Sequence, residues 1–328
     1  MIRFGVIGAG NIANTFSEAI QKGELDAELY AIASRSLEKA QSYQKKYGFK
    51  RAYGSYRDLY LDPLVDVIYL ATPHGLHYEQ MLDIINNNKH ILCEKSFTLN
   101  HKQASEVFAK AKEKNLFVME AVWTRFLPVI KELQDLVESG IIGQIKQIQA
   151  DFCFKADKPD HDRLFNKNLG GGALLDVGIY PITFANLFLG KPSHISSRVN
   201  MYPTGVDAEE DIHFSYKDAH AELKASLIKD QPLIGYIKGS KGYIEVDNFF
   251  FTEKARIYSK DGQLIKTIEN PHKVNGFEYE IEETIHAIKH NQLESRIMPH
   301  KETLSILKQM DYLRSSWGFT YPNEKEED

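Results

Sequence analysis

The sequence predicts a two-domain protein of the α/β plus α+β class, in which a doubly wound parallel sheet is followed by a mainly antiparallel open sheet. Its 328 residues are more than one ordinary domain holds and suit two. The first 120 residues alternate short apolar runs with helical patterns, as a parallel sheet requires. The later residues favour consecutive strands joined by short turns, which is typical of an antiparallel sheet. We therefore expect domains at residues 1–121 and 122–328.

The first domain contains five apolar runs with the composition of strands that are covered on both faces. They are Ile2–Gly8, Leu29–Ser34, Val67–Ala71, His90–Glu94 and Leu116–Glu120. The segments between them have helical periodicity. They are Ile12–Lys22, Leu37–Tyr47, Leu76–Asn88 and His101–Asn115. Asn100 precedes the last of these helices as a predicted N-cap, with Gln103 three residues later.

The second domain is expected to begin with a helix over Val129–Ser139 and then to consist mostly of strands. The predicted strands are Ile145–Phe154, His194–Tyr202, Asp211–Tyr216, Ala221–Ile228, Gly235–Lys238, Tyr243–Val246 and Ala255–Ser259. Turn signals such as Lys217-Asp218 and Asp261-Gly262 separate several of them. Two helices, Phe277–His290 and His300–Ser315, close the chain.

Composition and charge exclude several classes of protein. Apolar residues make up 43% and charged residues 26% of the chain, values that exclude a disordered or fibrous protein. A net charge of -5 gives no broad basic surface for nucleic acid. No apolar run approaches the roughly 18 residues that span a bilayer, so no membrane partner is expected. Cys93 and Cys153 are too few for a disulfide framework, and we expect a cytoplasmic protein.

A dinucleotide-binding fingerprint ends the first predicted strand. Gly8 and Gly10 form the pattern GxGxxA with Ala13 in the third small position. Gly8 allows a tight turn, Gly10 lets a pyrophosphate approach the backbone, and Ala13 keeps helix and strand close. Asn11 and Ile12 begin the helix, whose N–H groups and positive dipole end suit phosphates. The alternative is a glycine turn with a purely structural role.

The end of the second strand favours NADP over NAD. An NAD site usually has a carboxylate there for the ribose 2′-hydroxyl, whereas this chain has Ser34 and Arg35. A guanidinium pairs with a 2′-phosphate, and Lys39 lies one helical turn beyond it. If these residues are only an exposed loop, NAD remains possible as the cofactor.

Two further turns lie where the ligands of such a sheet bind, beyond the strand carboxyl ends. Thr72 and Pro73 form a tight turn suited to a nicotinamide ribose, and His74 and His77 follow it. The spacing of the two histidines also resembles that of a pair of metal ligands. No Cys or carboxylate cluster completes a ligand set, however, so no metal is expected. In the second turn, Glu94-Lys95 follows the strand that begins at His90, and a lysine there can face a substrate oxygen.

The second domain supplies candidate partners for Lys95. A glycine run at 170–172 leads into a predicted helix with Asp176 and Tyr180 four residues apart on one face. An ammonium about 4 Å from a phenolate stabilises it by up to about 4 kcal/mol at an effective dielectric near 20. This would lower the tyrosine pKa from about 10 towards 7 and allow proton transfer near neutral pH. The plain alternative is a surface lysine, a helix aspartate and a core tyrosine.

These motifs together resemble the glucose-fructose oxidoreductase, inositol dehydrogenase and rhizopine-catabolism superfamily (Gfo/Idh/MocA). The motifs that carry the resemblance are the amino-terminal GxGxxA, Ala71-Thr72-Pro73, Glu94-Lys95, and the run from Gly171 through Asp176 to Tyr180-Pro181. The segments 120–128, 276–281 and 318–322 resemble the dihydrodiol dehydrogenase and NADP-dependent xylose dehydrogenase branch. The resemblance covers essentially the whole chain. The chain departs from it at Ser96, where the family usually has proline, and at His74, where it often has asparagine.

The resemblance implies a nicotinamide oxidoreductase that acts on a carbinol of a sugar or cyclic diol. It implies that Lys95 is the catalytic lysine, that Tyr180 is the acid/base residue, and that Asp176 orients the substrate. It also implies pocket walls at Trp123, Arg125 and Phe277, and a homodimer or higher homo-oligomer formed by the open sheet face. The alternative function is a dinucleotide-bound sensor or regulatory protein without turnover.

Overall fold

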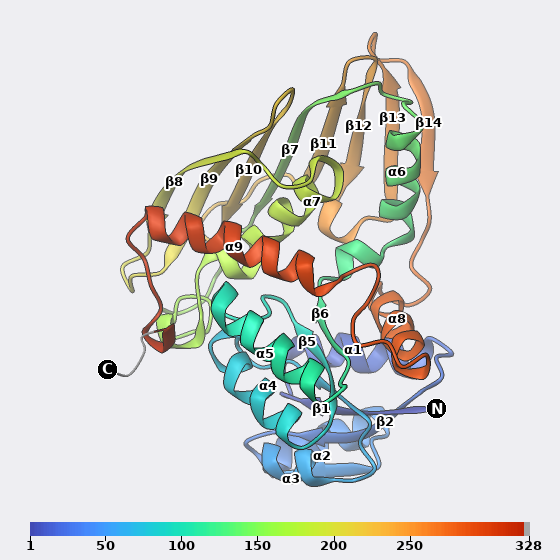
Figure 1. The fold of residues 1–328 in the computed structure, drawn as a ribbon, viewed down its shortest axis with the longest axis vertical. Coiled ribbons are helices and arrows are strands. Elements are labelled where there is room, and N and C mark those ends of the chain that lie inside the picture. The colour runs from blue at the N-terminus through green and yellow to red at the C-terminus, as the bar shows by residue number, and fades with distance from the viewer. Residues whose placement is uncertain (325–328) are drawn as a thin grey trace. The chain divides into compact units, whose positions relative to one another are not determined.

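The computed structural model describes residues 1–324, and the chain divides into two compact units. The first unit contains Met1–Val122 and His272–Leu304, and the second contains Trp123–Pro271 and the described residues from Ser305 onward (Figure 1). The units differ from the expected domain ranges because residues 272–304 return to the first unit. The end of the expected second range, 325–328, lies outside the described residues.

The first unit is built on a six-stranded sheet with the order β3-β2-β1-β4-β5-β6, in which every pair is parallel. The strands are β1 Ile2–Ile7, β2 Ala27–Ala33, β3 Arg51–Tyr53, β4 Val67–Leu70, β5 His90–Glu94 and β6 Val118–Ala121. The helices are α1 Asn11–Lys22, α2 Leu37–Tyr47, α3 Tyr56–Leu61, α4 His77–Asn86, α5 His101–Glu113 and α8 Glu278–Lys289. The predicted doubly wound sheet is confirmed, and its order reverses between β1 and β4, where such sheets bind ligands.

Local chemistry explains these elements. The central strand β4 is fully buried, as a strand covered on both faces must be; all four of its residues are inaccessible to solvent. The predicted cap of α5 is present, since the Asn100 side chain accepts a hydrogen bond from the Gln103 backbone N–H at 2.9 Å. The α1 ring of Phe16 stacks on Tyr69 of β4 with ring centroids 3.7 Å apart. This contact fixes the first helix against the centre of the sheet.

The second unit is built on an eight-stranded sheet with the order β14-β13-β12-β11-β7-β10-β9-β8. Its strands are β7 Ile145–Cys153, β8 His194–Met201, β9 Asp207–Ser215, β10 His220–Ser226, β11 Ile234–Gly239, β12 Gly242–Asp247, β13 Lys254–Ser259 and β14 Leu264–Glu269. Only the β7–β10 pair is parallel among the named pairs of the described residues. Its helices are α6 Pro128–Glu138, α7 Ile179–Leu189 and the residues from Ser305 onward of α9 His300–Ser316. The predicted mainly antiparallel sheet is therefore confirmed.

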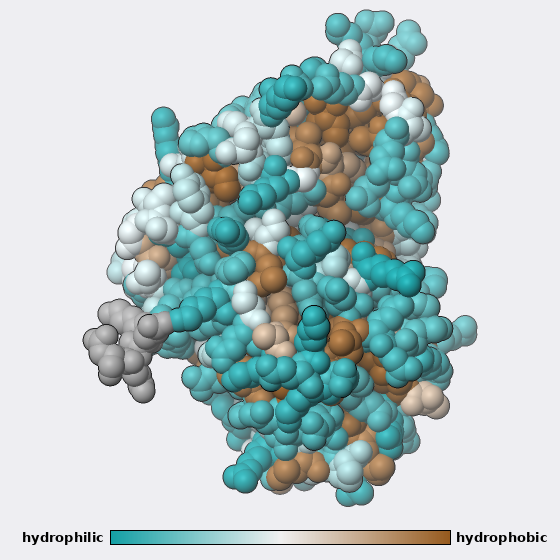
Figure 2. Space-filling view, in the orientation of Figure 1, coloured by the Kyte–Doolittle hydropathy of each residue, from teal (hydrophilic) through white to brown (hydrophobic). Residues whose placement is uncertain are grey.

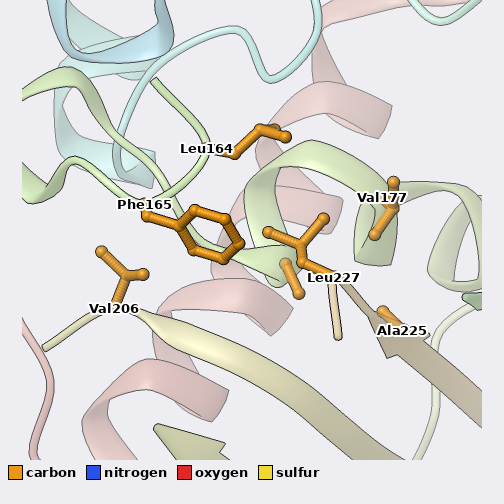
Figure 3. Close-up of a cluster of buried hydrophobic side chains, with 7 residues drawn as sticks. Leu164, Phe165, Val177, Val206, Ala225 and Leu227 are labelled. Atoms are coloured by element: carbon orange, nitrogen blue, oxygen red, sulfur yellow. The ribbon is translucent and has the colours of Figure 1, made fainter. Parts of the chain in front are cut away.

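A cluster of apolar side chains anchors the segment that leads into α7. The cluster consists of Leu164, Phe165, Ala173, Val177, Val206, Ala225 and Leu227. Figure 3 shows the Phe165 ring and the Leu227 side chain directed toward each other. Phe165 also stacks on Tyr202 with ring centroids 4.1 Å apart. The loop before α7 is thereby held against the ends of β9 and β10.

One helical stretch corrects the expectation that no apolar run is long enough to cross a bilayer. Among the described residues, Lys167–Leu189 is long and apolar enough by length and composition, and 78% of its apolar window is buried within the structure. That degree of burial is typical of a core helix, which reads as apolar on all sides. In the space-filling view, apolar side chains are visible around the position of α7 and β11 (Figure 2).

Candidate functional site

The glycine turn after β1 is required by the packing of two strand ends. Gly8 has φ +98°, and a Cβ at this position would lie 2.5 Å from the carbonyl oxygen of Ala71. A side chain here would meet backbone, which cannot move aside as a flexible side chain does. Gly10 is different, because its backbone is extended and a Cβ there would face open space. Gly8 thus closes the turn, while Gly10 leaves room beside the start of α1.

The helix that follows the turn presents its amino end without a side-chain cap. Gly10 occupies the N-cap position of α1 and has no side chain with which to cap it. The α2 helix braces this turn: the Tyr43 hydroxyl donates to the Gly10 carbonyl at 3.0 Å, and the Tyr47 hydroxyl donates to the Asn14 side chain at 2.7 Å. The N–H groups at Asn11 and Ile12 and the helix dipole suit a phosphate group. The residues present therefore fit a dinucleotide pyrophosphate.

The segment between β2 and α2 places two cations at the surface. Ser34 is buried and its hydroxyl accepts from the Ser36 N–H at 3.4 Å, while Ser36 caps α2 by accepting from the Lys39 N–H at 3.2 Å. The side chains of Arg35 and Lys39 are exposed. Burial raises the pKa of Tyr56, and the charge of nearby Arg35 opposes that rise. This corner can receive an anionic group such as a 2′-phosphate.

The turn after β4 is held from inside by a histidine. His77 is fully buried; its Nε2 lies 2.7 Å from the Thr72 carbonyl oxygen and its Nδ1 lies 3.0 Å from the Ser96 carbonyl oxygen. Burial lowers the pKa of His77 below its ordinary 6.5. The predicted cofactor residue His77 therefore faces backbone carbonyls with both ring nitrogens. Thr72 and His74 are also buried, whereas Pro73 is half-buried, and the Thr72 hydroxyl donates to Gln80 at 2.5 Å.

The loop that carries Lys95 begins at the end of β5. Glu94 is buried and accepts a hydrogen bond from the Tyr69 hydroxyl, whereas Lys95 is half-buried. The Lys95–Ser96 peptide bond is cis. Phe97 donates its N–H to the Glu120 carboxylate at 2.9 Å. Side chains from β4 and β6 thus fix the loop on both sides of the lysine.

A buried carboxyl group beside this loop escaped the sequence analysis. Both carboxyl oxygens of Glu280 in α8 are buried and accept no hydrogen bond from any described residue. Burial and the charge of Glu94 raise the pKa of Glu280 well above its usual range. A signal for it was present, because Glu280 lies on the same helical stripe as the buried Thr284 and Ala287. A carboxylate at a core position of an amphipathic helix is a candidate for a special environment.

In the second unit, Asp176 and Tyr180 lie on consecutive helical turns, but the first of these is a π-helical turn, Leu174–Gly178, and not the predicted α-helix. The Asp176 carboxylate accepts from Arg163 Nη1 at 2.8 Å. The Tyr180 ring is buried against Phe152 and Phe250, with centroids 5.4 and 5.5 Å away. These aromatic contacts hold the Tyr180 ring, and therefore its hydroxyl group, in one orientation.

The predicted pocket residues divide between the units. Trp123 stacks on Phe251 with centroids 4.7 Å apart, and Arg125 is half-buried in the same short helical turn; both belong to the second unit. Phe277 is buried in the first unit. The catalytic candidates divide in the same way, with Lys95 in the first unit and Asp176 and Tyr180 in the second. Within residues 1–324, no group of three or more His, Cys, Asp or Glu side chains could hold a metal ion.

Two further carboxyl groups missed by the sequence analysis lie beneath the π-helical turn. Asp207 of β9 is fully buried and accepts the Leu174 N–H at 2.6 Å. Burial raises the pKa of Asp207 to about 6, and burial together with Asp207 raises the pKa of Glu210 well above its usual range. A Cβ on Gly172 would lie 2.3 Å from Asp207, so the glycine lets the turn approach this carboxyl group. The strand was predicted to begin at Asp211, and its true start at Asp207 explains why both groups were overlooked.

Comparisons with known proteins agree with this geometry. The model of an oxidoreductase family with an NAD-binding Rossmann fold (GFO_IDH_MocA) matches residues 2–122, and a GFO/IDH/MocA C-terminal domain model matches residues 130–245. A trans-1,2-dihydrobenzene-1,2-diol dehydrogenase from Xenopus tropicalis is 32% identical, covering 98% of this chain and 99% of that protein. The scyllo-inositol 2-dehydrogenase (NADP(+)) IolU from Bacillus subtilis is also 32% identical, covering 99% of this chain and 100% of that protein.

A solved structure has a similar fold over almost the whole chain. KijD10, a 3-ketoreductase from Actinomadura kijaniata in complex with NADP and TDP-benzene, superposes with a TM-score of 0.87 at 26% identity. The match covers 96% of this chain and 97% of that chain. The resemblance drawn from the sequence motifs is thereby confirmed at the level of the family and its diol dehydrogenase branch.

The two glycines of the fingerprint should respond differently to alanine. Gly8→Ala should destabilise the first unit by about 1–3 kcal/mol, because alanine strains the positive φ and meets the Ala71 carbonyl. Gly10→Ala should leave the melting temperature unchanged but weaken NADPH binding by about tenfold, or about 1.4 kcal/mol. Thermal melts and NADPH fluorescence titrations separate the two effects. A Gly8→Ala protein that melts like the wild type would contradict the packing argument.

The raised pKa of Asp207 predicts that stability falls as the pH rises through about 6. Above the ordinary pKa of 3.8 the folded state binds more protons than the unfolded state, so the free energy of unfolding falls by about 3 kcal/mol across this range. Asp207→Asn keeps the acceptor for Leu174 and cannot ionise. Its melting temperature should therefore fall less than that of the wild type between about pH 4 and about pH 7. Asp218→Asn, an exposed change in the turn after the same strand, should keep the wild-type pH dependence.

Proposed function

The chain belongs to the Gfo/Idh/MocA oxidoreductase family, and on that premise we propose that it is an NADP-dependent dehydrogenase or reductase of a sugar or cyclic vicinal diol. The observation that carries the proposal is similarity along the whole chain to enzymes named for diol and inositol oxidation. The same similarity favours an oxidoreductase over a dinucleotide-bound sensor without turnover. Substrates of this kind share a carbinol carbon beside a second hydroxyl group.

When bound, the nicotinamide would exchange a hydride with the carbinol carbon of the substrate. We assign the accompanying proton transfer to the Tyr180 hydroxyl, which accepts the substrate hydroxyl proton in oxidation and returns it in reduction. The Lys95 ammonium favours negative charge on oxygen during that transfer. Asp176, which accepts a hydrogen bond from Arg163, has an acceptor suited to a neighbouring substrate hydroxyl. Trp123, Arg125 and Phe277 are proposed as pocket walls.

We assign the nucleotide to the first unit. The turn at Gly8 and Gly10 and the start of α1 would hold the pyrophosphate, and the turn at Thr72–His74 and the Glu94-Lys95 loop would lie near the nicotinamide ribose. Arg35 and Lys39 would receive the 2′-phosphate, because two exposed cations at the end of β2 attract a dianion. NADP is therefore the proposed cofactor, and NAD is expected to bind more weakly.

We further propose a cytoplasmic homodimer or higher homo-oligomer. Both cysteines are free and buried, which suits a reducing compartment. A shallow depression on the polar face of β8, β9 and β10 is lined by charges of both signs, including Arg198, Asp211 and Lys224. A self-complementary surface of this kind suits pairing about a two-fold axis. Light scattering of the purified chain measures the oligomeric state.

The catalytic assignment predicts that Lys95→Met and Tyr180→Phe each lower kcat by about 10²–10⁴-fold while NADPH binding persists. The matched controls, Lys112→Met and Tyr312→Phe, change exposed residues of the same types and should keep wild-type kcat. Because both residues are assigned to one proton transfer, the double variant should lose less than the product of the single losses. Wild-type turnover by Lys95→Met, with a panel of aldoses and cyclic diols, would contradict the assignment.

The cofactor assignment predicts a selective loss in the double variant Arg35→Ala, Lys39→Ala. Removing one or two charge-assisted hydrogen bonds, each worth about 1.5–3 kcal/mol, should raise the Kd for NADPH by about tenfold or more. The Kd for NADH should stay the same, because NADH lacks the 2′-phosphate. Lys45→Ala, an exposed change in the last turn of α2, is the control. Equal losses for both nucleotides would overturn the assignment.

A further inference from the structure

His77 is a buried residue that contacts two loops of the first unit at once. Its ring is inaccessible to solvent at the start of α4. On one side, Nε2 lies 2.7 Å from the carbonyl oxygen of Thr72, in the turn after β4. On the other side, Nδ1 lies 3.0 Å from the carbonyl oxygen of Ser96, directly after Lys95, and 3.4 Å from the Cys93 sulfur. The ring therefore bridges the two segments that end the neighbouring strands β4 and β5.

The partners of each nitrogen define what the ring can do. Carbonyl oxygens only accept hydrogen bonds, so a nitrogen that pairs with one must carry a proton. The shorter contact is the one to Thr72, which places the proton of a neutral ring on Nε2. Nδ1 then accepts from the Cys93 S–H, the donor within reach on the β5 side. A proton on Nδ1 would instead bind the Ser96 carbonyl. In every protonation state the ring is bonded to at least one segment and packed against the other.

Full burial makes these contacts matter energetically. A buried ring nitrogen without a partner loses its hydrogen bonds to water and gains none in return, which destabilises the structure. A ring that bonds Thr72 through Nε2 and Cys93 of β5 through Nδ1, and packs against Ser96, therefore opposes the movement of either segment. The neighbouring Phe97 carbonyl, 3.3 Å from Nδ1, extends the contact along the same loop.

We propose that His77 is a positioning residue for the reaction, because it ties the Thr72 turn to the Lys95 loop. The proposal rests on the proposed function, since the Thr72 turn is assigned to the nicotinamide ribose and Lys95 to the proton transfer. The Nε2 side of the ring would hold the turn that binds cofactor, and the Nδ1 side would hold the loop that carries the ammonium. A displacement of about 1 Å in such a group reduces turnover by roughly 10²-fold.

Two conservative substitutions test the Nε2 side and the Nδ1 side of the His77 ring separately. In His77→Gln the side-chain amide N–H reaches the place of Nε2 and keeps the bond to Thr72, but the Nδ1 contacts are lost. In His77→Asn the side-chain amide lies at the place of Nδ1, where it can accept from the Cys93 S–H or donate to the Ser96 carbonyl, but the Thr72 contact is lost. His77→Leu fills the space and keeps neither bond. The control is His90→Asn, whose acceptor preserves the bond from the Phe117 N–H, 2.9 Å long, at the opposite end of β5.

The first measurement is amide hydrogen exchange of the purified variants, which does not depend on activity. The glutamine variant should exchange faster over residues 94–97 only, and the asparagine variant over residues 72–76 only. The leucine variant should show both changes and the control neither. Uniform exchange changes across the first unit, or none, would overturn the proposal.

The second measurement is kinetic and separates kcat from cofactor affinity. His77→Gln should lower kcat by roughly 10²-fold with an unchanged Kd for NADPH. His77→Asn should raise the Kd for NADPH by about tenfold and largely keep kcat at saturation. Parallel losses of kcat and affinity in both variants would show a merely structural role. If the wild type turns over no sugar or diol while the exchange pattern is as expected, the proposed function is wrong, but the link that His77 makes between the two loops is confirmed.

Discussion

The close approach of β1 to the turn after β4 is the constraint on which the first unit depends. A parallel sheet reverses its strand order between these two strands, so their carboxyl ends open onto one crevice. The Gly8 backbone lies so near the Ala71 carbonyl that no side chain fits. This contact fixes where α1 begins and where Thr72 lies. His77 contacts the carbonyl oxygens of Thr72 and Ser96, and it therefore connects this turn to the Lys95 loop.

Both units place buried carboxyl groups beneath the segments assigned to catalysis. Glu280 lies near Glu94 in the first unit, and Asp207 and Glu210 lie beneath the π-helical turn in the second. A buried carboxyl group opposes folding when it ionises because its charge loses hydration by water, and each of these three has a raised pKa. Groups of this kind gather at functional sites, where a set geometry matters more than maximal stability. Their burial beside the Lys95 loop and beneath the π-helical turn makes these two segments candidate functional segments.

The sequence was informative wherever local periodicity and special residues coincide. The five predicted strands of the first domain, the Asn100 cap and the glycine turn all follow from residue chemistry within a short window. The strand β3 was missed because three residues, Arg51–Tyr53, are too few to show alternation. The strand β14, Leu264–Glu269, was missed because it is an edge strand and almost entirely exposed. The return of residues 272–304 to the first unit depends on contacts between distant parts of the chain, which periodicity does not encode.

Within the candidate site, some residues hold the shape of the loops, and others are assigned to the recognition of the ligand. A Cβ on Gly8 would lie 2.5 Å from the Ala71 carbonyl oxygen, and the His77 ring nitrogens lie 2.7 and 3.0 Å from carbonyl oxygens, so almost any replacement changes the loops themselves. Arg35 and Lys39 are exposed, and the hydrogen bonds that shape their segment come from Ser34 and Ser36. We therefore expect a change of charge at these exposed positions to alter which nucleotide is favoured without disturbing the turn assigned to its pyrophosphate. On this assignment the choice between NADP and NAD is separable from the fold, whereas the position of the Lys95 loop depends on it.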